Sequence, residues 1–267
     1  MGFAIVVRHA GVLKAIMDTI KDRIFTVSLT CDETGLKMQS QDSSTWVFLS
    51  LRLHQTSLSK CSFDQETKLR MSTETIWKFL GTCSCRDSVE IEYEENMNTV
   101  RFRCVGTAKQ RVIEFDLRPL DFSDELRWRL PPDQQHMAVA QLPSQQFQKI
   151  CKGLQGFGHT VRIAADWQAI SFIVDGDLGR AAVSLRQRDS EKLEEKVTLE
   201  VRSPVTAQFW LQYLLDFARG APLFGTVELG LTAGAPVRVR YHIQNPENGH
   251  MDLFLAPRRH HAQPARA

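Results

Sequence analysis

Apolar residues recur along this chain with two different spacings. At residues 3–7 they alternate with other side chains, which predicts a strand. A first helix is predicted at residues 11–21, where the apolar residues keep to one face at helical spacing. These residues are Leu13, Ile16, Met17 and Ile20. The same spacing predicts further helices at residues 73–81, 144–154 and 206–218.

Alternating segments fill most of the remaining chain and predict strands. They cover residues 24–31, 35–40, 45–53, 89–93, 100–104, 111–117, 135–141, 161–163, 170–174, 181–185, 227–231, 237–243 and 251–255. Both halves of the chain show the same order of helices and strands, which indicates a repeated unit. We therefore expect an α+β fold of two similar domains, each with two helices packed on curved antiparallel sheets. The expected parts are residues 1–117 (first domain), 118–133 (connecting loop), 134–257 (second domain) and 258–267 (disordered basic tail).

The connecting loop has the composition of an extended surface segment, with several acids and two adjacent prolines. It also contains large apolar residues, among them Leu126 and Trp128, which a plain linker would not need. We expect these side chains to serve a docking site.

A related signal comes from the strand predicted at residues 45–53. Trp46 and Phe48 lie on the face opposite Leu49 and Leu51, where a half-buried strand would carry polar groups. Something is therefore expected to cover the two aromatic rings. They either lie under the connecting loop as ordinary core or form part of a groove that binds a partner.

The net charge is only +2, but basic residues gather on the polar faces of the predicted helices. They are Lys14, Lys21, Lys78, Lys149, Lys152 and Arg219. Acids collect in the loops instead, and Asp18 is the clearest acid on a helix. This asymmetry predicts contact with nucleic-acid phosphates, against the alternative that these faces are merely solvated.

The sequence shows no sign of catalysis, of a metal or of a cofactor. Its six cysteines lack the spacing of a metal site, and its eight histidines form no catalytic motif. The chain also has no apolar run of the roughly 18 residues that a membrane span needs. We expect a protein that is not an enzyme, binds no cofactor and does not associate with membranes.

Three segments, residues 35–44, 117–132 and 249–257, resemble the proliferating cell nuclear antigen family, the eukaryotic-type DNA sliding clamps. The likeness extends from end to end of the chain. It implies a homotrimeric ring with helices lining the hole and sheets outside. Double-stranded DNA passes through without sequence recognition, and DNA polymerase and other proteins bind the outer face through clamp-binding peptides. A clamp loader as a further partner and a place in the nucleus, or in a viral replication compartment, are also implied.

The resemblance, together with the strand pattern, assigns three sets of residues. The DNA-binding set is the six basic residues named above. The partner-binding groove comprises Gln41, Trp46, Phe48, Leu126, Trp128, Pro236, Phe254, Leu255, Ala256 and Pro257. The subunit interface comprises Arg111, Phe115, Leu154, Ala181 and Val183, because residues 111–117 and 178–186 are expected at sheet edges.

The chain departs from the family pattern at several of these places. Gln41 replaces the usual methionine of the groove. Basic positions of the inner helices are taken by Ala15, Gly81 and Gly156, so a less positive channel is expected. Trp167 stands where the family carries the lysine used for ubiquitin signalling.

Two other readings stay open at this level. One is a checkpoint-type clamp subunit or a non-ring processivity factor of the same fold, which oligomeric state would distinguish. The other is a two-domain enzyme whose site is not apparent in the sequence, which a buried cluster of perturbed acids or histidines would reveal.

Overall fold

The computed structural model describes residues 2–106, 110–121, 135–192, 195–243 and 246–258. Its α-helices are α1 (Ala10–Ile20), α2 (Thr73–Gly81), α3 (Ser144–Leu154) and α4 (Leu211–Phe217). Its 3-10 helices are η1 (Gln55–Ser57), η2 (Glu95–Met97), η3 (Ala218–Leu223) and η4 (Pro246–Asn248).

The strands of the first half are β1 (Gly2–Val7), β2 (Thr26–Asp32), β3 (Gly35–Gln41), β4 (Val47–His54), β5 (Leu58–Phe63), β6 (Thr67–Ser72), β7 (Ser88–Glu94), β8 (Thr99–Val105) and β9 (Val112–Leu117). Those of the second half are β10 (Ala138–Pro143), β11 (Thr160–Ala165), β12 (Ala169–Gly176), β13 (Gly179–Arg186), β14 (Thr198–Val201), β15 (Val205–Trp210), β16 (Thr226–Leu231), β17 (Val237–His242) and β18 (Gly249–Leu255).

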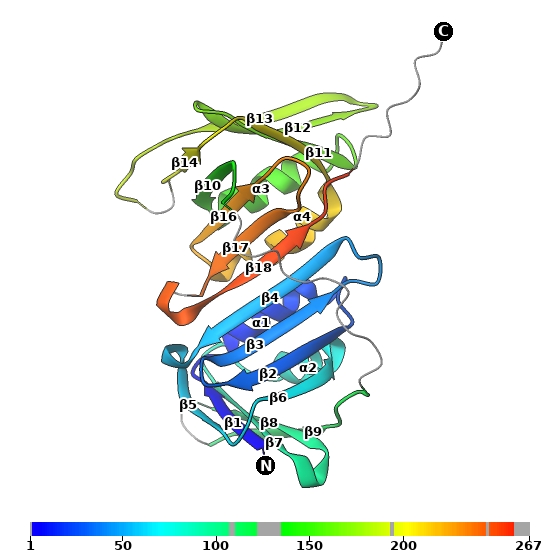
Figure 1. Ribbon diagram of the computed structural model, residues 1–267, viewed down its shortest axis with the longest axis vertical. Coiled ribbons are helices and arrows are strands. Elements are labelled where there is room, and N and C mark those ends of the chain that lie inside the picture. Colours follow the sequence, from blue (N-terminus) through cyan, green and yellow to red (C-terminus); the bar gives the residue numbers. More distant parts are fainter. Residues whose placement is uncertain (1, 107–109, 122–134, 193–194, 244–245, 259–267) are drawn as a thin grey trace.

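The strands form three antiparallel sheets, one of which runs through both halves of the chain (Figure 1). The five-stranded sheet has the order β5-β1-β7-β8-β9, and the four-stranded sheet has the order β13-β12-β11-β15. The nine-stranded sheet has the order β14-β10-β16-β17-β18-β4-β3-β2-β6. Its two halves meet where β18 pairs with β4, from Gly249↔Leu53 to Leu255↔Val47.

Two glycines allow β4 to sit closely between its neighbours. Gly35 begins β3 with φ +125°, and Gly249 begins β18 with φ +128°. A Cβ atom would lie 2.1 Å from Leu53 O at Gly35 and 2.0 Å from Arg52 O at Gly249. Any other residue would therefore push β4 away from the sheet at these two points.

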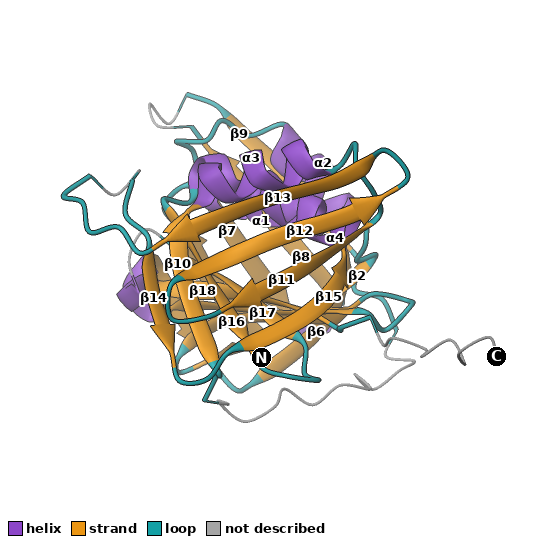
Figure 2. Ribbon diagram, turned by 90° about the horizontal axis from the view of Figure 1, so that it is seen from above, coloured by secondary structure: helices purple, strands orange, loops and turns teal. Residues whose placement is uncertain are grey.

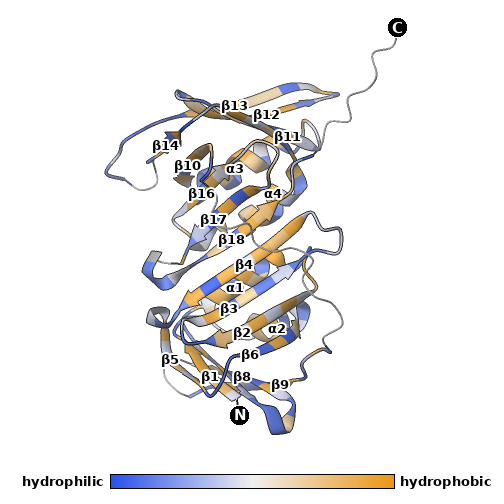
Figure 3. Cartoon of the chain, in the orientation of Figure 1, coloured by the Kyte–Doolittle hydropathy of each residue, from blue (hydrophilic) through white to orange (hydrophobic). Residues whose placement is uncertain are grey.

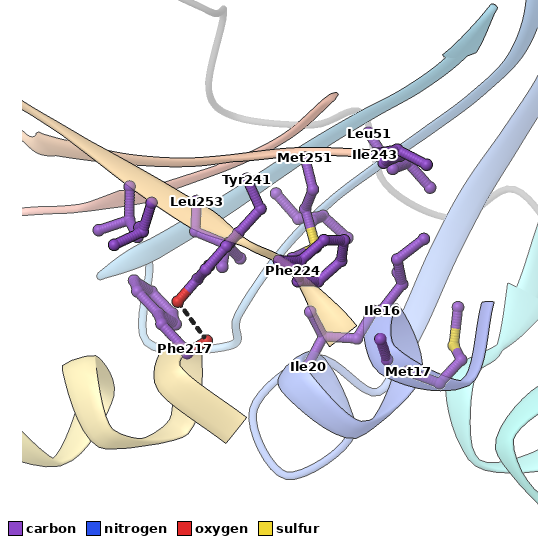
Figure 4. Close-up of a cluster of buried hydrophobic side chains, with 14 of the residues drawn as sticks. Ile16, Met17, Ile20, Leu51, Phe217, Phe224, Tyr241, Ile243, Met251 and Leu253 are labelled. Atoms are coloured by element: carbon purple, nitrogen blue, oxygen red, sulfur yellow. Dashed lines mark hydrogen bonds between the residues drawn. The ribbon is translucent and has the colours of Figure 1, made fainter. Parts of the chain in front are cut away.

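The helices pack together against the sheets, as Figure 2 shows for α1, α2, α3 and α4. Apolar and polar residues alternate along many strands in Figure 3. The apolar residues of strands and helices belong to one buried cluster. Where the two halves meet, Ile16 and Ile20 of α1 lie beside Phe224 and Met251 (Figure 4). The buried Tyr241 hydroxyl donates to Phe217 O over 3.1 Å, and burial raises the pKa of this phenol. One continuous core thus connects the halves.

The fold class expected from the sequence is confirmed, but the helix predicted at residues 206–218 is wrong in its first part. Residues up to Trp210 form β15, which pairs with β11 through Val161↔Phe209, and α4 starts only at Leu211. Phe209 points into the core, fully buried, and the strand pairing satisfies the backbone groups that a helix would have bonded internally. Tertiary pairing here overrides the local apolar spacing.

Besides β15, three strands were missed because each carries only a short or broken run of alternating apolar residues. Leu58 is the one buried residue of β5, and β14 has none among its four residues. β6 buries only Leu69 and Met71. Each lies at the edge of its sheet, where one side of the strand faces solvent.

Candidate nucleic-acid interface and partner groove

Lys14 of α1 and Lys21, which follows its last residue, both contact the segment that contains α2. Lys14 Nζ donates to Cys83 O over 2.8 Å. Lys21 Nζ lies 4.0 Å from the ring centroid of Trp77, whose Nε1 donates to Asp18 Oδ1 over 2.9 Å. A cation over an indole ring keeps its full charge. Both lysines are half-buried, so the structure fixes where their charges lie.

The basic residues of α2 and α3 differ in their surroundings. Lys78 is exposed and lies 2.6 Å from Glu74, one helical turn earlier. Lys149 and Lys152 are exposed on α3, and within the part of the chain that the structure describes neither forms an ion pair. The two α3 lysines are therefore the exposed members of the expected set that no carboxylate of the described residues offsets.

Arg219 is bound between two carboxylates of its own chain. It contacts Asp22 through Nη1 and donates from Nη2 to Asp216 Oδ1 over 2.9 Å. Arg23 Nε adds a contact of 2.6 Å to Asp216 Oδ2. We call Asp22, Arg23, Asp216 and Arg219 the helix-end cluster, because they join the ends of α1 and α4. The assignment of Arg219 to the DNA-binding set stays a prediction, but its charge is largely balanced within the chain.

Sequence reasoning missed the acids of this cluster. Asp22 comes just after the end of α1, and Asp216 was read as part of an apolar helix. Asp216 is only 2% exposed. Charge alternation along the sequence could not show that two helix ends so distant in the chain meet.

The predicted groove residues line up across four strands of the nine-stranded sheet. Gln41 lies opposite Phe48, Phe48 opposite Phe254, and Phe254 opposite Arg238. Side chains at such paired positions share one face of a sheet. The Phe48 and Phe254 rings lie 6.2 Å apart at an angle of 52°. Neither ring belongs to the main apolar core, so both occupy the opposite face, as expected from the alternation.

The remaining groove residues extend this row at one end. Trp46 precedes β4 and accepts at its carbonyl a bond of 2.9 Å from Ala256 N. Pro236 precedes β17, whose first residue Val237 pairs with Leu255. Pro236, Ala256 and Pro257 are half-buried. We call Trp46, Phe48, Pro236, Phe254 and Ala256 the apolar strip.

The two central rings of this strip are covered, as expected for Phe48. Phe48 is 2% exposed and Phe254 9% exposed, while Trp46 is half-buried. Leu255 is fully buried, because it points to the core face with Val47. Leu126 and Trp128 lie outside the described residues.

Gln41 carries an unusual feature for a residue beside this strip. Its Oε1 atom is buried, and no donor reaches it among the residues that the structure describes. Buried polar atoms are normally hydrogen-bonded. The strip thus ends at an acceptor that a bound partner could satisfy.

Arg258, the first residue of the expected tail, is anchored. Its N–H donates to Gln208 O over 2.7 Å, and its guanidinium carbon lies 4.6 Å from the ring centroid of Trp210. The boundary of a disordered tail at residue 258 is therefore corrected by at least one residue. Residues 259–267 lie outside the described part.

The two strands expected at sheet edges are at edges. β9 ends the five-stranded sheet and β13 ends the four-stranded sheet. Phe115 of β9 is half-buried, with its ring 5.3 Å from that of Phe79, and Ala181 and Val183 are half-buried on β13. Apolar side chains at both edges thus retain surface that a neighbour could cover.

Two other expected interface residues are engaged within the chain. Arg111 lies 2.8 Å from the buried Asp87, and a bond from the Ser84 amide together with this guanidinium holds the pKa of the Asp87 carboxyl below its ordinary value. Leu154 is 2% exposed. Its assignment to a subunit contact is corrected, because its side chain already lies in the core of its own half.

Trp167 lies at the turn between β11 and β12 and is 70% exposed. Asp166 Oδ1 shapes this turn by accepting from Gln168 N over 2.8 Å and Ala169 N over 2.9 Å. These bonds lower the pKa of Asp166.

Among the described residues, no group of three or more His, Cys, Asp or Glu side chains could hold a metal ion. No helix in the described ranges is long and apolar enough to cross a membrane.

Comparison with known proteins accounts for both halves. The model of the proliferating cell nuclear antigen N-terminal domain matches residues 3–125, and that of its C-terminal domain matches residues 131–258. The proliferating cell nuclear antigen of Caenorhabditis elegans is 31% identical over 252 residues, which cover 94% of each chain. This chain therefore belongs to the proliferating cell nuclear antigen family of DNA sliding clamps.

Proposed function

We propose that the chain assembles head to tail into a homotrimeric ring that encircles duplex DNA and tethers replication and repair enzymes in the nucleus. The observation that carries this proposal is the position of two edge strands, β9 and β13, at opposite ends of the molecule (Figure 1). Open edges invite pairing with another strand. A heterologous contact between them generates a ring if the rotation closes.

The inner faces of the two edges also match in character. Ile113, Phe115 and Leu117 of β9 are half-buried against their own core. Ala181, Val183 and Leu185 occupy the corresponding face of β13. Pairing would cover both sets and continue the apolar layer from one subunit into the next.

DNA contact in this proposal is electrostatic. Lys14, Lys21, Lys149 and Lys152 present charge from the helix layer, and phosphates attract such charge without regard to sequence. With Arg219 balanced by acids and Lys78 paired with Glu74, the attraction is weak for linear DNA. Topological enclosure by the ring, rather than affinity, would then hold the chain on DNA.

Partners would bind at the apolar strip through a short peptide. A peptide that buries an aromatic or aliphatic anchor gains about 1.5–3 kcal/mol per side chain. Two or three anchors are enough for micromolar binding after ordering costs. DNA polymerase and a clamp loader are the expected partners of this kind.

The test is solution mass across protein concentration, with retention on circular DNA measured on the same sample. The expected result is a trimer that a loader places on circular DNA and that leaves when the DNA is linearised. Phe115→Ala should lower the assembled mass. Phe63→Ala is the matched control, because Phe63 lies on β5 at the opposite edge of the same sheet. A wild-type chain that remains monomeric at every concentration would favour a non-ring factor of this fold.

A further inference from the structure

The outer face of the β9 edge is strongly acidic. Its carboxylates lie on two strands of the five-stranded sheet: Glu90, Glu92 and Glu94 on β7, and Glu114 and Asp116 on the edge strand β9. Arg101 and Arg103 of β8 lie between them. Arg101 Nε is 3.2 Å from Glu114 and 3.0 Å from Asp116, and Arg103 is 3.2 Å from Glu90 and 3.8 Å from Glu114. Five carboxylates thus share two guanidinium groups, and an excess of negative charge faces the solvent.

The outer face of the β13 edge has the opposite excess. Arg180 and Arg186 are exposed on β13, and Arg162 lies two strands away on β11. Asp175 lies 3.7 Å from Arg180 and 3.2 Å from Arg162, so one carboxylate is shared by two guanidinium groups. Arg186 forms no ion pair within the described residues. Positive charge therefore remains on β13 after the internal pairs are made.

The excess negative charge of β9 and the excess positive charge of β13 lie on the same face of the joined sheet whenever β9 and β13 pair with their apolar faces aligned. On β9 the odd-numbered residues 113, 115 and 117 point inward, and Glu114 and Asp116 point outward. On β13 residues 181, 183 and 185 point inward, and Arg180 and Arg186 point outward. Successive side chains of a strand point to opposite faces of the sheet. If the apolar side chains of β9 and β13 meet on the face that covers the core, the charged side chains therefore meet on the solvent face.

The charges also meet for each of the three most central registers. Consider an antiparallel pairing of β9 with β13 in which Phe115 lies opposite Val183. Asp116 then lies diagonally opposite Arg180, and Glu114 lies diagonally opposite Arg186. Diagonal neighbours are within reach of long side chains. A shift of two residues in either direction keeps the faces aligned. It places one arginine directly opposite one acid and diagonally opposite the other.

From this we infer that Glu114 and Asp116 of one subunit and Arg180 and Arg186 of a second copy form a charged seam that selects head-to-tail assembly. The inference rests on the proposed ring and adds what sets its specificity. Two β9 edges brought together would oppose acid to acid, and two β13 edges would oppose arginine to arginine. Such like-charge contacts disfavour the two-fold dimers that open edges otherwise allow.

The experiment uses charge reversal on either edge and on both. Glu114→Arg/Asp116→Arg makes both edges basic, and Arg180→Glu/Arg186→Glu makes both edges acidic. Each double variant should weaken trimer formation by about tenfold or more at low salt, and high salt should reduce this difference. The variant with all four changes restores opposite charges at every seam, so it should regain the trimer.

Mixing the two double variants gives a sharper outcome. Each edge of one double variant then has the opposite charge to the edge that it meets on the other variant, so the two variants should associate. In a ring of three subunits, however, two neighbours must be the same variant. The seam between them therefore brings like charges together. The mixture should therefore form pairs or open chains more readily than closed trimers.

The matched control is Glu92→Arg/Glu94→Arg, which changes the net charge equally but on β7, two strands away from the edge. It should weaken trimer formation far less than either edge reversal, because these two carboxylates do not lie at the seam. Circular dichroism on each variant separates loss of assembly from loss of folding, and Glu114→Gln/Asp116→Asn provides a milder change if the reversal unfolds β9. A wild-type trimer that both reversals leave unchanged would overturn the seam while the ring stands. A wild-type chain that never assembles would instead contradict the ring itself.

Discussion

Arg23 Nε lies 2.6 Å from Asp216 Oδ2, which joins two helix ends that are 193 residues apart in the sequence. Asp216 also accepts from Gln212 Nε2 over 3.2 Å and from Arg219. With both carboxylate oxygens bonded and the side chain 2% exposed, Asp216 is a structural residue of the junction between the halves.

We expect Asp216→Ala to lower the free energy of unfolding by about 3 kcal/mol, because it leaves two guanidinium groups without their shared carboxylate. Asp22→Ala is the control, since Asp22 is half exposed and its pair with Arg219 should contribute about 1 kcal/mol or less. Urea denaturation of both variants measures the difference. Equal stabilities would show that the helix-end cluster does not support the junction.

The α3 lysines should dominate the salt dependence of DNA binding. Lys149→Ala and Lys152→Ala should each reduce the slope of log affinity against log salt by about 0.9, the value for one lost phosphate contact. Lys78→Ala should reduce it less, because Glu74 already offsets that charge. Lys60→Ala on β5 is the control for a lysine outside the helix layer. A strong preference for one DNA sequence would contradict this account.

Acid should destabilise the chain through a pair of histidines. His242 and His250 face each other on β17 and β18, and burial lowers the pKa of both rings despite the nearby Asp252. The folded state therefore binds protons less readily than the unfolded state. Stability should be full above the ordinary histidine pKa of about 6.5 and decline as the pH falls below it. Melting temperature measured from pH 7.5 to pH 5 checks this, and His242→Gln should flatten the decline.

Much of the fold was readable from the sequence because single segments carried the signal. The apolar stripe of Leu13, Ile16 and Ile20 is buried as α1 requires, and Phe48 lies on the face that alternation gave it. The failures are places where distant groups decide. β15 is a strand because it pairs with β11, and Arg219 is neutralised by Asp22 from the other half of the chain. The spacing of residue types along the chain contains no information about contacts between such distant segments.

Modification at residue 167 should not occur, since an indole has no amine for conjugation. Trp167→Lys should fold normally, because the side chain is 70% exposed and the turn depends on Asp166 instead. In a conjugation assay with ubiquitin enzymes that act on clamps, we expect peptide mapping to find a conjugate at 167 in this variant alone. A Trp167→Lys variant without a conjugate would show that more than the missing amine prevents modification here.

Gln41 should influence which peptides bind the apolar strip. Its buried Oε1 has no donor among the described residues, and Phe48 lies directly across from it. An unsatisfied buried acceptor costs about 1–3 kcal/mol, so Gln41→Met should raise the free energy of unfolding by about 1 kcal/mol. A peptide that donates to this oxygen beside a small apolar anchor should bind the wild type more tightly than Gln41→Met. Peptides without the donor should show the reverse. Titration of both peptide types measures this, with Phe254→Ala/Leu126→Ala as the control that should weaken both. Equal affinities of wild type and Gln41→Met for every peptide would exclude Gln41 as a determinant of partner choice.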